Sequence, residues 1–410
     1  MTPREHWKKE TALFLTSQTL SILGTMLVQY AIMWHITLTT QSGVMMTISI
    51  VAGFIPTFIL SPFAGVWADR FDRKRLIMLA DFGIALTTLI ATIIFWTGWG
   101  SLWILFAMSA VRAFGSAVQN PAVGAFLPQF VPEDQLMRVN GINGSIQSVI
   151  MLVSPMLSGA LMTVAPLETI FMIDVVTAGL AIAVLYFLKV EPHARALEKG
   201  KVDYFGDLKD GINYVKNHPF IRGFFIFTAF FHVLITPVAT LTPLQVTRTF
   251  GEDIWRLTAI EIAFSIGMLI GGLVMASWGG FRNRVHSMVL ATFVLGLLTV
   301  ALGIVPDFWV YLLIMGITGL TIPLFNTPAT VLIQEKVEPN YLGRVFSVMA
   351  MIYSSTMPAS MLFFGPLADV IDIEWMLIAT GLLVFIQAFF LGGSKVMIKA
   401  GEPKVQEAES

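Results

Sequence analysis

The sequence contains no cysteine and few charged residues. The lack of cysteine excludes disulfide bonds, thiolate metal sites and cysteine nucleophiles. Asp, Glu, Lys and Arg make up 12% of the 410 residues, against roughly 25% in soluble proteins. The 25 basic residues are offset by 26 acidic ones, so the basic excess of a nucleic-acid-binding protein is missing. With 56% hydrophobic residues, the composition predicts an integral membrane protein embedded in the lipid bilayer.

Long stretches without charge predict the membrane helices, because a helix needs about 20 apolar residues to cross a bilayer. No Asp, Glu, Lys or Arg occurs from Thr11 to Ala68, and a polar break at residues 39–43 divides this stretch into two helices. The first stretch is too long for a signal peptide, so we expect it to be retained. Further apolar stretches bring the predicted helices to twelve and the fold class to all-α. They cover residues 76–97, 102–126, 139–166, 169–188, 223–247, 257–278, 285–305, 308–334, 345–368 and 375–394.

Lys and Arg gather on one side of this predicted membrane arrangement. They occur in both terminal segments, in the loop after the second helix and in the central polar stretch. The loops of the opposite side hold only Arg248 and Arg256. Because basic loops remain in the cytoplasm, we expect both termini of this multi-pass protein there.

A short repeat lies half a chain length apart. Pro121 and Pro132 recur as Pro328 and Pro339, in each case 207 residues later. The fourth and tenth helices therefore correspond, which predicts two parallel repeats of six helices. Transporters built in this way bind substrate near the middle of the membrane, where the repeats meet.

The repeat divides the chain into three parts. We expect an N-terminal half at residues 1–189, a cytoplasmic linker at 190–218, and a C-terminal half with a short cytoplasmic tail at 219–410. Within the linker, residues 204–217 place Phe205, Leu208, Ile212 and Val215 on one helical face. This pattern predicts a short helix on the membrane surface.

The loop after the second helix reads G-V-W-A-D-R-F-D-R-K-R from Gly65 to Arg75. It resembles the signature loop of the major facilitator superfamily, with Asp72 in place of a second glycine. In that family the aspartate, here Asp69, contacts the start of the eleventh helix, where the helix dipole favours a carboxylate. Without the resemblance, the basic residues would only mark the cytoplasmic side. The gating residues that the resemblance implies are Gly65, Asp69, Arg70, Arg73, Arg75 and Arg344.

Two membrane helices carry partial family motifs. Arg112 and Gly115 resemble the fourth-helix motif, whose arginine is linked to proton coupling. The alternative is a structural ion pair, since a guanidinium inside a membrane needs a partner or water. The fifth helix resembles the antiporter motif of exporters, although Ile150 breaks it. The small residues and proline that match permit tight helix packing, and they are Gly141, Ser154, Pro155, Ser158 and Gly159.

Other ionisable residues also fall inside the predicted helices. An intramembrane carboxylate is by default a functional candidate, so Glu261 and Asp174 join Arg112 as predicted proton-coupling residues. Asp81 lies six residues after Arg75, about 9 Å along the helix. We expect Asp81 to support the basic loop and His232 to be a hydrogen-bonded packing residue.

A cavity for a drug-sized molecule needs apolar walls and a few polar anchors. The 22 methionines and 32 phenylalanines can supply such walls, and methionine adapts its shape to different ligands. The candidate cavity residues are Gln18, Gln29, Tyr30, Trp34, Asn120, Gln147, Phe231 and Asn326.

Residues 260–264 and 341–347, together with Val131-Pro132-Glu133, resemble bacterial macrolide-efflux permeases of the superfamily. The resemblance implies a transporter of the bacterial cytoplasmic membrane that exports amphipathic drugs in exchange for protons. A siderophore or another metabolite is the alternative substrate, and a receptor that binds without transport is a further alternative. The sequence shows no paired catalytic groups and no nucleotide-binding loop. We therefore expect a protein that is not an enzyme and uses no metal or cofactor. We also expect it to be a monomer.

Overall fold

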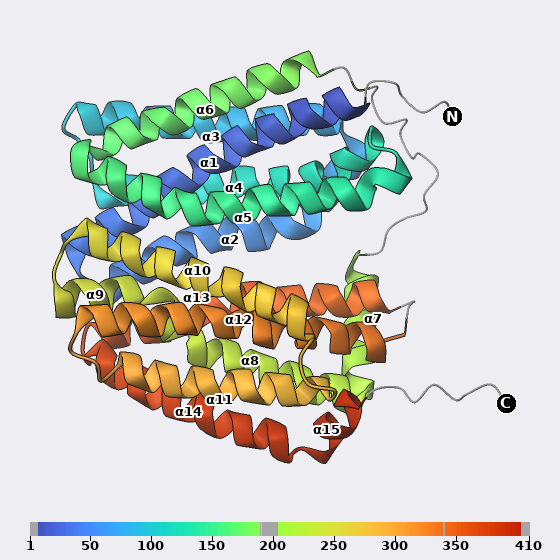
Figure 1. Ribbon diagram of the computed structural model, residues 1–410. Helices are drawn as coiled ribbons and strands as arrows, with labels where there is room; N and C mark the ends of the chain where they lie inside the picture. The colour runs from blue at the N-terminus through green and yellow to red at the C-terminus, as the bar shows by residue number, and fades with distance from the viewer. Residues whose placement is uncertain (1–6, 189, 191–203, 339–340, 403–410) are drawn as a thin grey trace. The chain divides into compact units, whose positions relative to one another are not determined.

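The computed structural model describes residues 7–188, 190, 204–338 and 341–402 of the chain. In this part of the chain the secondary structure is entirely helical, with helices α1 to α15 and the short 3₁₀ helix η1 (Figure 1). Twelve helical segments among the described residues are long and apolar enough to cross a membrane. The predicted class, an all-α membrane protein, is therefore confirmed.

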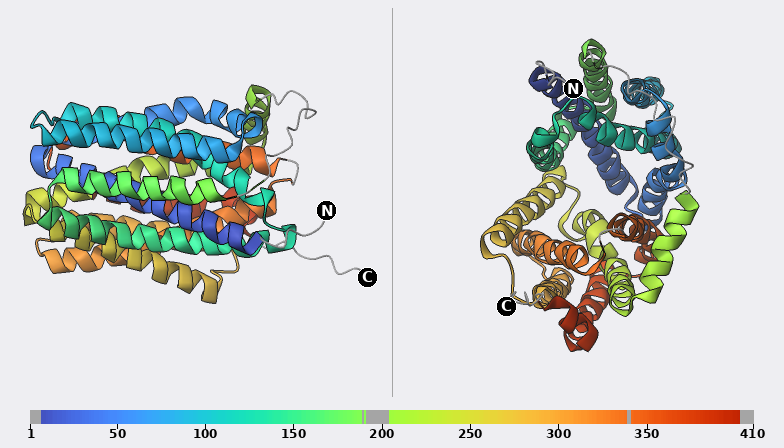
Figure 2. Two further views of the ribbon diagram at one scale, coloured as in Figure 1. Left: turned by 90° about the horizontal axis from the view of Figure 1, so that it is seen from above. Right: turned by 90° about the vertical axis from the view of Figure 1, so that its right-hand side faces the viewer.

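The chain folds as two compact units. The N-terminal unit contains Met1–Thr40 and Ile48–Val202, and the C-terminal unit contains Gln41–Thr47 and Asp203–Ser410. Within each unit the long helices run side by side (Figure 2). The first helices are α1 (Trp7–Thr40), α2 (Gly43–Arg70), α3 (Arg73–Trp96), α4 (Leu102–Phe126), η1 (Leu127–Gln129), α5 (Glu133–Val164) and α6 (Leu167–Phe187).

The remaining helices follow the central stretch. They are α7 (Tyr204–Asn217), α8 (Pro219–Thr240), α9 (Thr242–Phe250), α10 (Ile254–Trp278), α11 (Arg284–Leu302), α12 (Phe308–Lys336), α13 (Leu342–Ala368), α14 (Ile373–Gly393) and α15 (Lys395–Gly401).

Several helices begin before the apolar stretch that predicted them. Helix α5 starts at Glu133, six residues ahead of the predicted start at Val139. Charged residues end a hydrophobic stretch without ending a helix, and Glu133 and Asp134 suit the positive end of the helix dipole. The seventh predicted helix is instead divided after Thr240, and α9 then begins with Pro243 in its first turn.

The linker helix α7 has the bounds that the sequence indicated, Tyr204–Asn217. Tyr214 and Val215 of this helix are buried in the core of the C-terminal unit. The ring of Tyr214 stacks on Tyr341, with centroids 4.4 Å apart. The helix therefore docks onto the start of α13, in addition to any contact with the membrane surface.

Close packing of α10 and α12 depends on glycine. A Cβ atom at Gly267 would lie 1.9 Å from the carbonyl oxygen of Gly316, and one at Gly271 would lie 2.4 Å from that of Leu320. From the other helix, a Cβ atom at Gly319 would lie 2.1 Å from the carbonyl oxygen of Phe264. Small residues at such positions let two membrane helices approach to backbone contact.

We predict that Gly271→Ala destabilises the protein, because the added methyl group overlaps the backbone of α12. Overpacking of this kind costs about 1–3 kcal/mol and should lower the melting temperature of the purified protein in detergent. Gly272→Ala is the matched control, since a Cβ atom there would meet no described atom within 4 Å. Equal melting temperatures for both variants would contradict the packing described for α10 and α12.

Candidate functional site

A buried ion pair joins α4 to α6 in the N-terminal unit. Nη1 of Arg112 contacts Oδ2 of Asp174 and also donates to the hydroxyl of Thr88 on α3. The hydroxyl of Thr88 lies 3.1 Å from the same carboxylate oxygen. Arg112 is 7% exposed and Asp174 1% exposed. Two of the predicted coupling residues are thus brought together, in the ion pair that a guanidinium inside a membrane requires.

Helix α1 packs closely against α6 beside the ion pair. A Cβ atom at Gly24 would lie 2.2 Å from Oγ1 of Thr177 and 2.8 Å from Oδ1 of Asp174. The absence of a side chain at Gly24 therefore allows α1 to lie directly against Asp174. On the next residue, the carbonyl oxygen of Thr25 lies 3.5 Å from Nη2 of Arg112.

A second buried carboxylate lies in the same unit. Oδ1 of Asp81 accepts hydrogen bonds from the hydroxyl of Ser21 on α1 and from Nε2 of Gln119 on α4, both at 2.7 Å. Asp81 is 1% exposed. The expectation that it supports the basic loop is wrong, because its face of α3 turns toward α1 and α4 in the interior.

The two carboxylates belong to one column of polar groups. Asp81 precedes Thr88 by seven residues on α3, and Gln119 follows Arg112 by seven on α4. Seven residues make two helical turns and about 10 Å, so each spacing returns to the same face. This spacing was the signal in the sequence that could have linked Asp81 to the arginine.

The third predicted coupling residue lies elsewhere. Glu261 is on α10 in the C-terminal unit, where it is partly exposed and makes contacts of its own. His232, on α8, hydrogen-bonds to the carbonyl oxygen of Thr228 at 2.8 Å and stacks on Tyr353. His232 is thus a hydrogen-bonded packing residue, as expected.

The predicted cavity residues differ in exposure. Gln18, Trp34 and Phe231 are buried. The ring of Phe231 stacks on Phe325, with centroids 4.4 Å apart. Tyr30 is partly buried beside Trp34. The exposed members of the set are Gln29, Asn120, Gln147 and Asn326.

An apolar groove of about 680 Å³ runs along the C-terminal unit between α8 and α14 and reaches α15. Phe227, Phe230, Leu383 and Phe390 line it. The amide of Gln387 lies in its wall and donates to the carbonyl oxygen of Phe227 at 2.8 Å. None of the predicted cavity residues lines this groove.

The loop between α2 and α3 is described in part. The side chains at Gly65, Asp69 and Arg70 lie outside the described residues. Arg73 ties the loop to two helix ends, donating from Nε to the carbonyl oxygen of Ala68 at 2.9 Å and from Nη1 to that of Ala125 at 2.8 Å.

Asp72 is the N-cap of α3. Its backbone has φ −61° and ψ 113°, and its carboxylate accepts from the backbone N–H of Arg75 at 3.1 Å. The left-handed conformation that favours glycine is absent at this position, so aspartate replaces the family's glycine without strain and caps the helix. Arg344, near the start of α13, lies over the ring of Tyr341.

The partial exporter motif lies along α5. Ser154, Pro155, Ser158 and Gly159 are buried, and the Ser158 hydroxyl donates to the carbonyl oxygen of Leu27 on α1 at 3.1 Å. Gly141 is exposed, and a Cβ atom there would meet no described atom within 4 Å. Close packing is therefore found at the serine end of the motif and not at Gly141.

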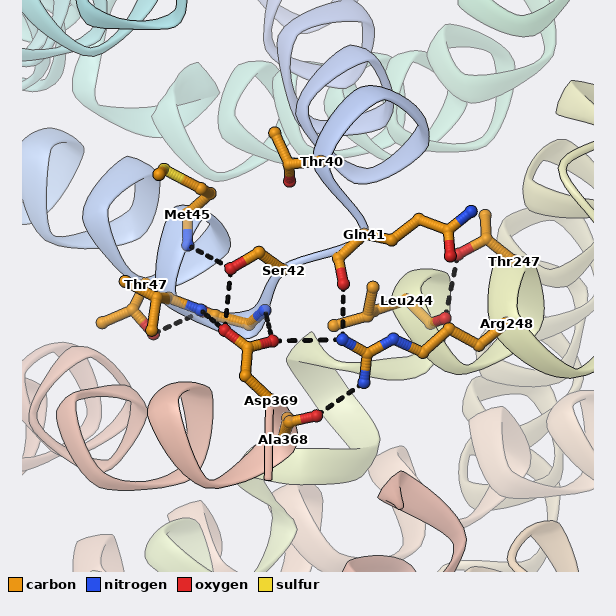
Figure 3. Close-up of polar contacts among 12 residues, drawn as sticks. Thr40, Gln41, Ser42, Met45, Thr47, Leu244, Thr247, Arg248, Ala368 and Asp369 are labelled. Carbon is orange, nitrogen blue, oxygen red and sulfur yellow. Dashed lines mark hydrogen bonds and ion pairs between the residues drawn. The ribbon is translucent and has the colours of Figure 1, made fainter. Parts of the chain in front are cut away.

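Sequence analysis missed a polar cluster at the predicted outer ends of the helices (Figure 3). Asp369, directly after α13, accepts from the backbone N–H groups of Gly43 at 2.6 Å and Val44 at 3.0 Å, and from the hydroxyl of Ser42 at 2.7 Å. The first N–H groups of a helix lack partners within it, and a carboxylate there also complements the dipole. Asp369 thus caps α2.

Arg248 on α9 completes this cluster. Its guanidinium lies 3.1 Å from Oδ1 of Asp369 and donates to the carbonyl oxygens of Ala368 and Gln41. Burial raises the pKa of Asp369, but the hydrogen bonds from Val44, Ser42, Gly43 and Arg248 outweigh it and hold the pKa below 3.8. We call Ser42, Gly43, Val44, Arg248 and Asp369 the acidic clasp.

Residues 11–360 match the family described as the Major Facilitator Superfamily. The chain belongs to this superfamily. The resemblance drawn from the loop and helix motifs is thereby confirmed, and the chain is a membrane transporter by family.

This superfamily member has relatives along nearly its whole length. It is 28% identical to Macrolide efflux protein A of Streptococcus pyogenes over 387 residues, which cover 93% of this chain and 95% of that protein. It is 23% identical to the Staphyloferrin A transporter of Staphylococcus aureus over 398 residues, covering 96% and 98%. A crystal structure of a bacterial homologue of the iron transporter ferroportin in the inward-facing state gives a TM-score of 0.72 at 15% identity, covering 94% of this chain and 99% of that chain.

We predict that Asp174→Asn destabilises this transporter. The substitution leaves Arg112 buried without its carboxylate, and breaking one partner of a buried ion pair costs about 3–5 kcal/mol. The melting temperature in detergent should fall and should recover in the double variant Arg112→Met/Asp174→Leu, which removes both charges. A single variant as stable as the wild type would show that the pair does not lie in a dry interior.

The acidic clasp yields a second prediction. Because the chain has no cysteine, Val44→Cys is a clean reporter at the start of α2. Asp369→Asn removes the charge that caps α2, so a maleimide should label this cysteine several-fold faster in purified protein. Asp372→Asn, a nearby exposed aspartate with no side-chain cap hydrogen bond, is the matched control. Equal labelling rates in the two variants would contradict the clasp.

The pH dependence of the clasp follows from the lowered pKa of Asp369. A carboxyl group with a depressed pKa stabilises the fold above its unfolded pKa and loses that contribution as the pH falls through the folded value. The labelling rate of Val44→Cys is divided by the rate of a second cysteine, introduced at an exposed position. This ratio should stay constant from about pH 8 to pH 5 and should rise only when the pH falls below 3.8.

Proposed function

We propose that this chain is a secondary active exporter that exchanges an amphipathic drug such as a macrolide for protons, by alternating access. The similarity to Macrolide efflux protein A over 93% of the chain supports the substrate class. The observation that carries proton coupling is the buried network of Arg112, Asp174 and Thr88, because intramembrane ionisable groups mark proton relays in transporters.

Several earlier expectations stand as parts of this proposal. Glu261 would supply a coupling carboxylate in the C-terminal unit, and Asp69 would gate the transporter at the loop after α2. The exposed polar residues Gln29, Asn120, Gln147 and Asn326 would contact the drug. The basic loops would keep both termini in the cytoplasm.

A siderophore is the second candidate substrate, because the Staphyloferrin A transporter is similar over 96% of the chain. An anionic siderophore favours a basic binding site. Arg112, the basic residue that the sequence placed inside the membrane, is already paired with Asp174. The pairing therefore favours a macrolide over an anionic siderophore.

The proposal is tested by uptake of a radiolabelled macrolide into proteoliposomes with an acidic lumen. Molecules inserted with their cytoplasmic side outward should accumulate the macrolide as protons leave, and a protonophore should abolish the accumulation. Accumulation of labelled, iron-free staphyloferrin A in place of the macrolide would favour the second candidate. Accumulation of neither would overturn the proposed exchange.

The same assay tests Glu261. If this carboxylate couples drug movement to protons, Glu261→Gln should exchange labelled for unlabelled macrolide yet fail to accumulate it against a gradient. Asp372→Asn, an exposed acid on the same unit, is the control and should accumulate macrolide normally. Normal accumulation by Glu261→Gln would remove Glu261 from the coupling mechanism.

A further inference from the structure

Asp81 is the buried carboxylate that the proposed function has not used. Its oxygen Oδ1 is saturated by two donors, Ser21 and Gln119. Its oxygen Oδ2 is also buried, and none of the described residues donates a hydrogen bond to it. A bare charged oxygen in a water-poor interior is costly, and a proton on Oδ2 would remove that charge.

The charges around Asp81 distinguish it from Asp174. Helix α3 packs against α4 and α6, whose charged groups inside the unit are Arg112 and Asp174. Helix α1, which carries Ser21, has no Asp, Glu, Lys or Arg between Thr11 and Thr40. The one cation in this interior is committed to Asp174, so among the described residues Asp81 has no cationic partner.

We propose that Asp81, held by Ser21 and Gln119, is the site at which the N-terminal unit binds and releases a proton. This inference rests on the proposed function and sharpens it. Arg112 gives Asp174 a cationic partner, whereas Asp81 has none among the described residues and changes its charge during transport. Two carboxylates in environments that differ in this way commonly take different roles.

The position of Asp81 suits that role. It lies in the third turn of α3, counted from the predicted cytoplasmic side, whereas Thr88 and the ion pair lie two turns deeper. On α1, Gln18 precedes Ser21 by three residues and so shares its face. The amide nitrogen of Gln18 is buried and, in the described structure, also has no hydrogen-bond partner. A second unsatisfied polar atom therefore lies on α1, one turn nearer the predicted cytoplasmic side than Ser21, the partner of Asp81.

Infrared difference spectroscopy tests the proposal without a substrate. Acidifying purified protein from about pH 9 to about pH 6 leaves exposed carboxylates, whose pKa is near 4, almost fully ionised. The wild type should develop a carboxylic-acid C=O band that Asp81→Asn lacks and Asp372→Asn retains. Asp81→Glu keeps a carboxyl group at this position and should therefore show the band. This variant keeps the test decisive if Asp81→Asn does not fold. A band of unchanged area in folded Asp81→Asn would overturn the proposal.

Transport gives the second readout. Asp81→Asn should exchange labelled for unlabelled macrolide but show no accumulation driven by the pH gradient. Gradient-driven accumulation in this variant would also overturn the proposal. If the wild type moves no macrolide at all, the proposed function fails while the infrared result still decides whether Asp81 binds a proton.

Discussion

A polar group inside a membrane must be satisfied by the protein itself, because lipid offers it no hydrogen bond. This constraint shapes the N-terminal unit. The guanidinium of Arg112 is surrounded by a carboxylate, a hydroxyl and a backbone carbonyl from three different helices. Gly24 then allows α1 to close against the carboxylate. One buried cation on α4 therefore links α1, α3 and α6.

The same constraint explains why the two carboxylates of this unit differ. Asp174 is paired with the guanidinium of Arg112. Asp81 receives only the neutral donors of Ser21 and Gln119, so the cost of its charge is relieved in part. Glu261 lies in the other unit and would extend the proposed coupling to a second part of the chain.

The sequence predicted most of the fold because apolar stretches are a strong signal. Helix α4 begins and ends at the bounds of the apolar stretch from Leu102 to Phe126, which only Arg112 interrupts. It failed where three-dimensional position matters. Depth along α3 suggested that Asp81 served the basic loop, but depth does not show which face of the helix a residue occupies. The acidic clasp joins residues more than 300 positions apart, Asp369 to Ser42 and to Gly43, and no local pattern marks such contacts.

The central claim is that drug and protons move in opposite directions through this chain, and the proton flux caused by a drug gradient tests it most directly. Proteoliposomes that trap a pH-sensitive dye would receive a macrolide gradient with no initial pH gradient. We expect macrolide that enters the vesicles to drive protons out, so that the lumen becomes alkaline, and a protonophore to collapse this change. Macrolide entry with a constant luminal pH would contradict the exchange.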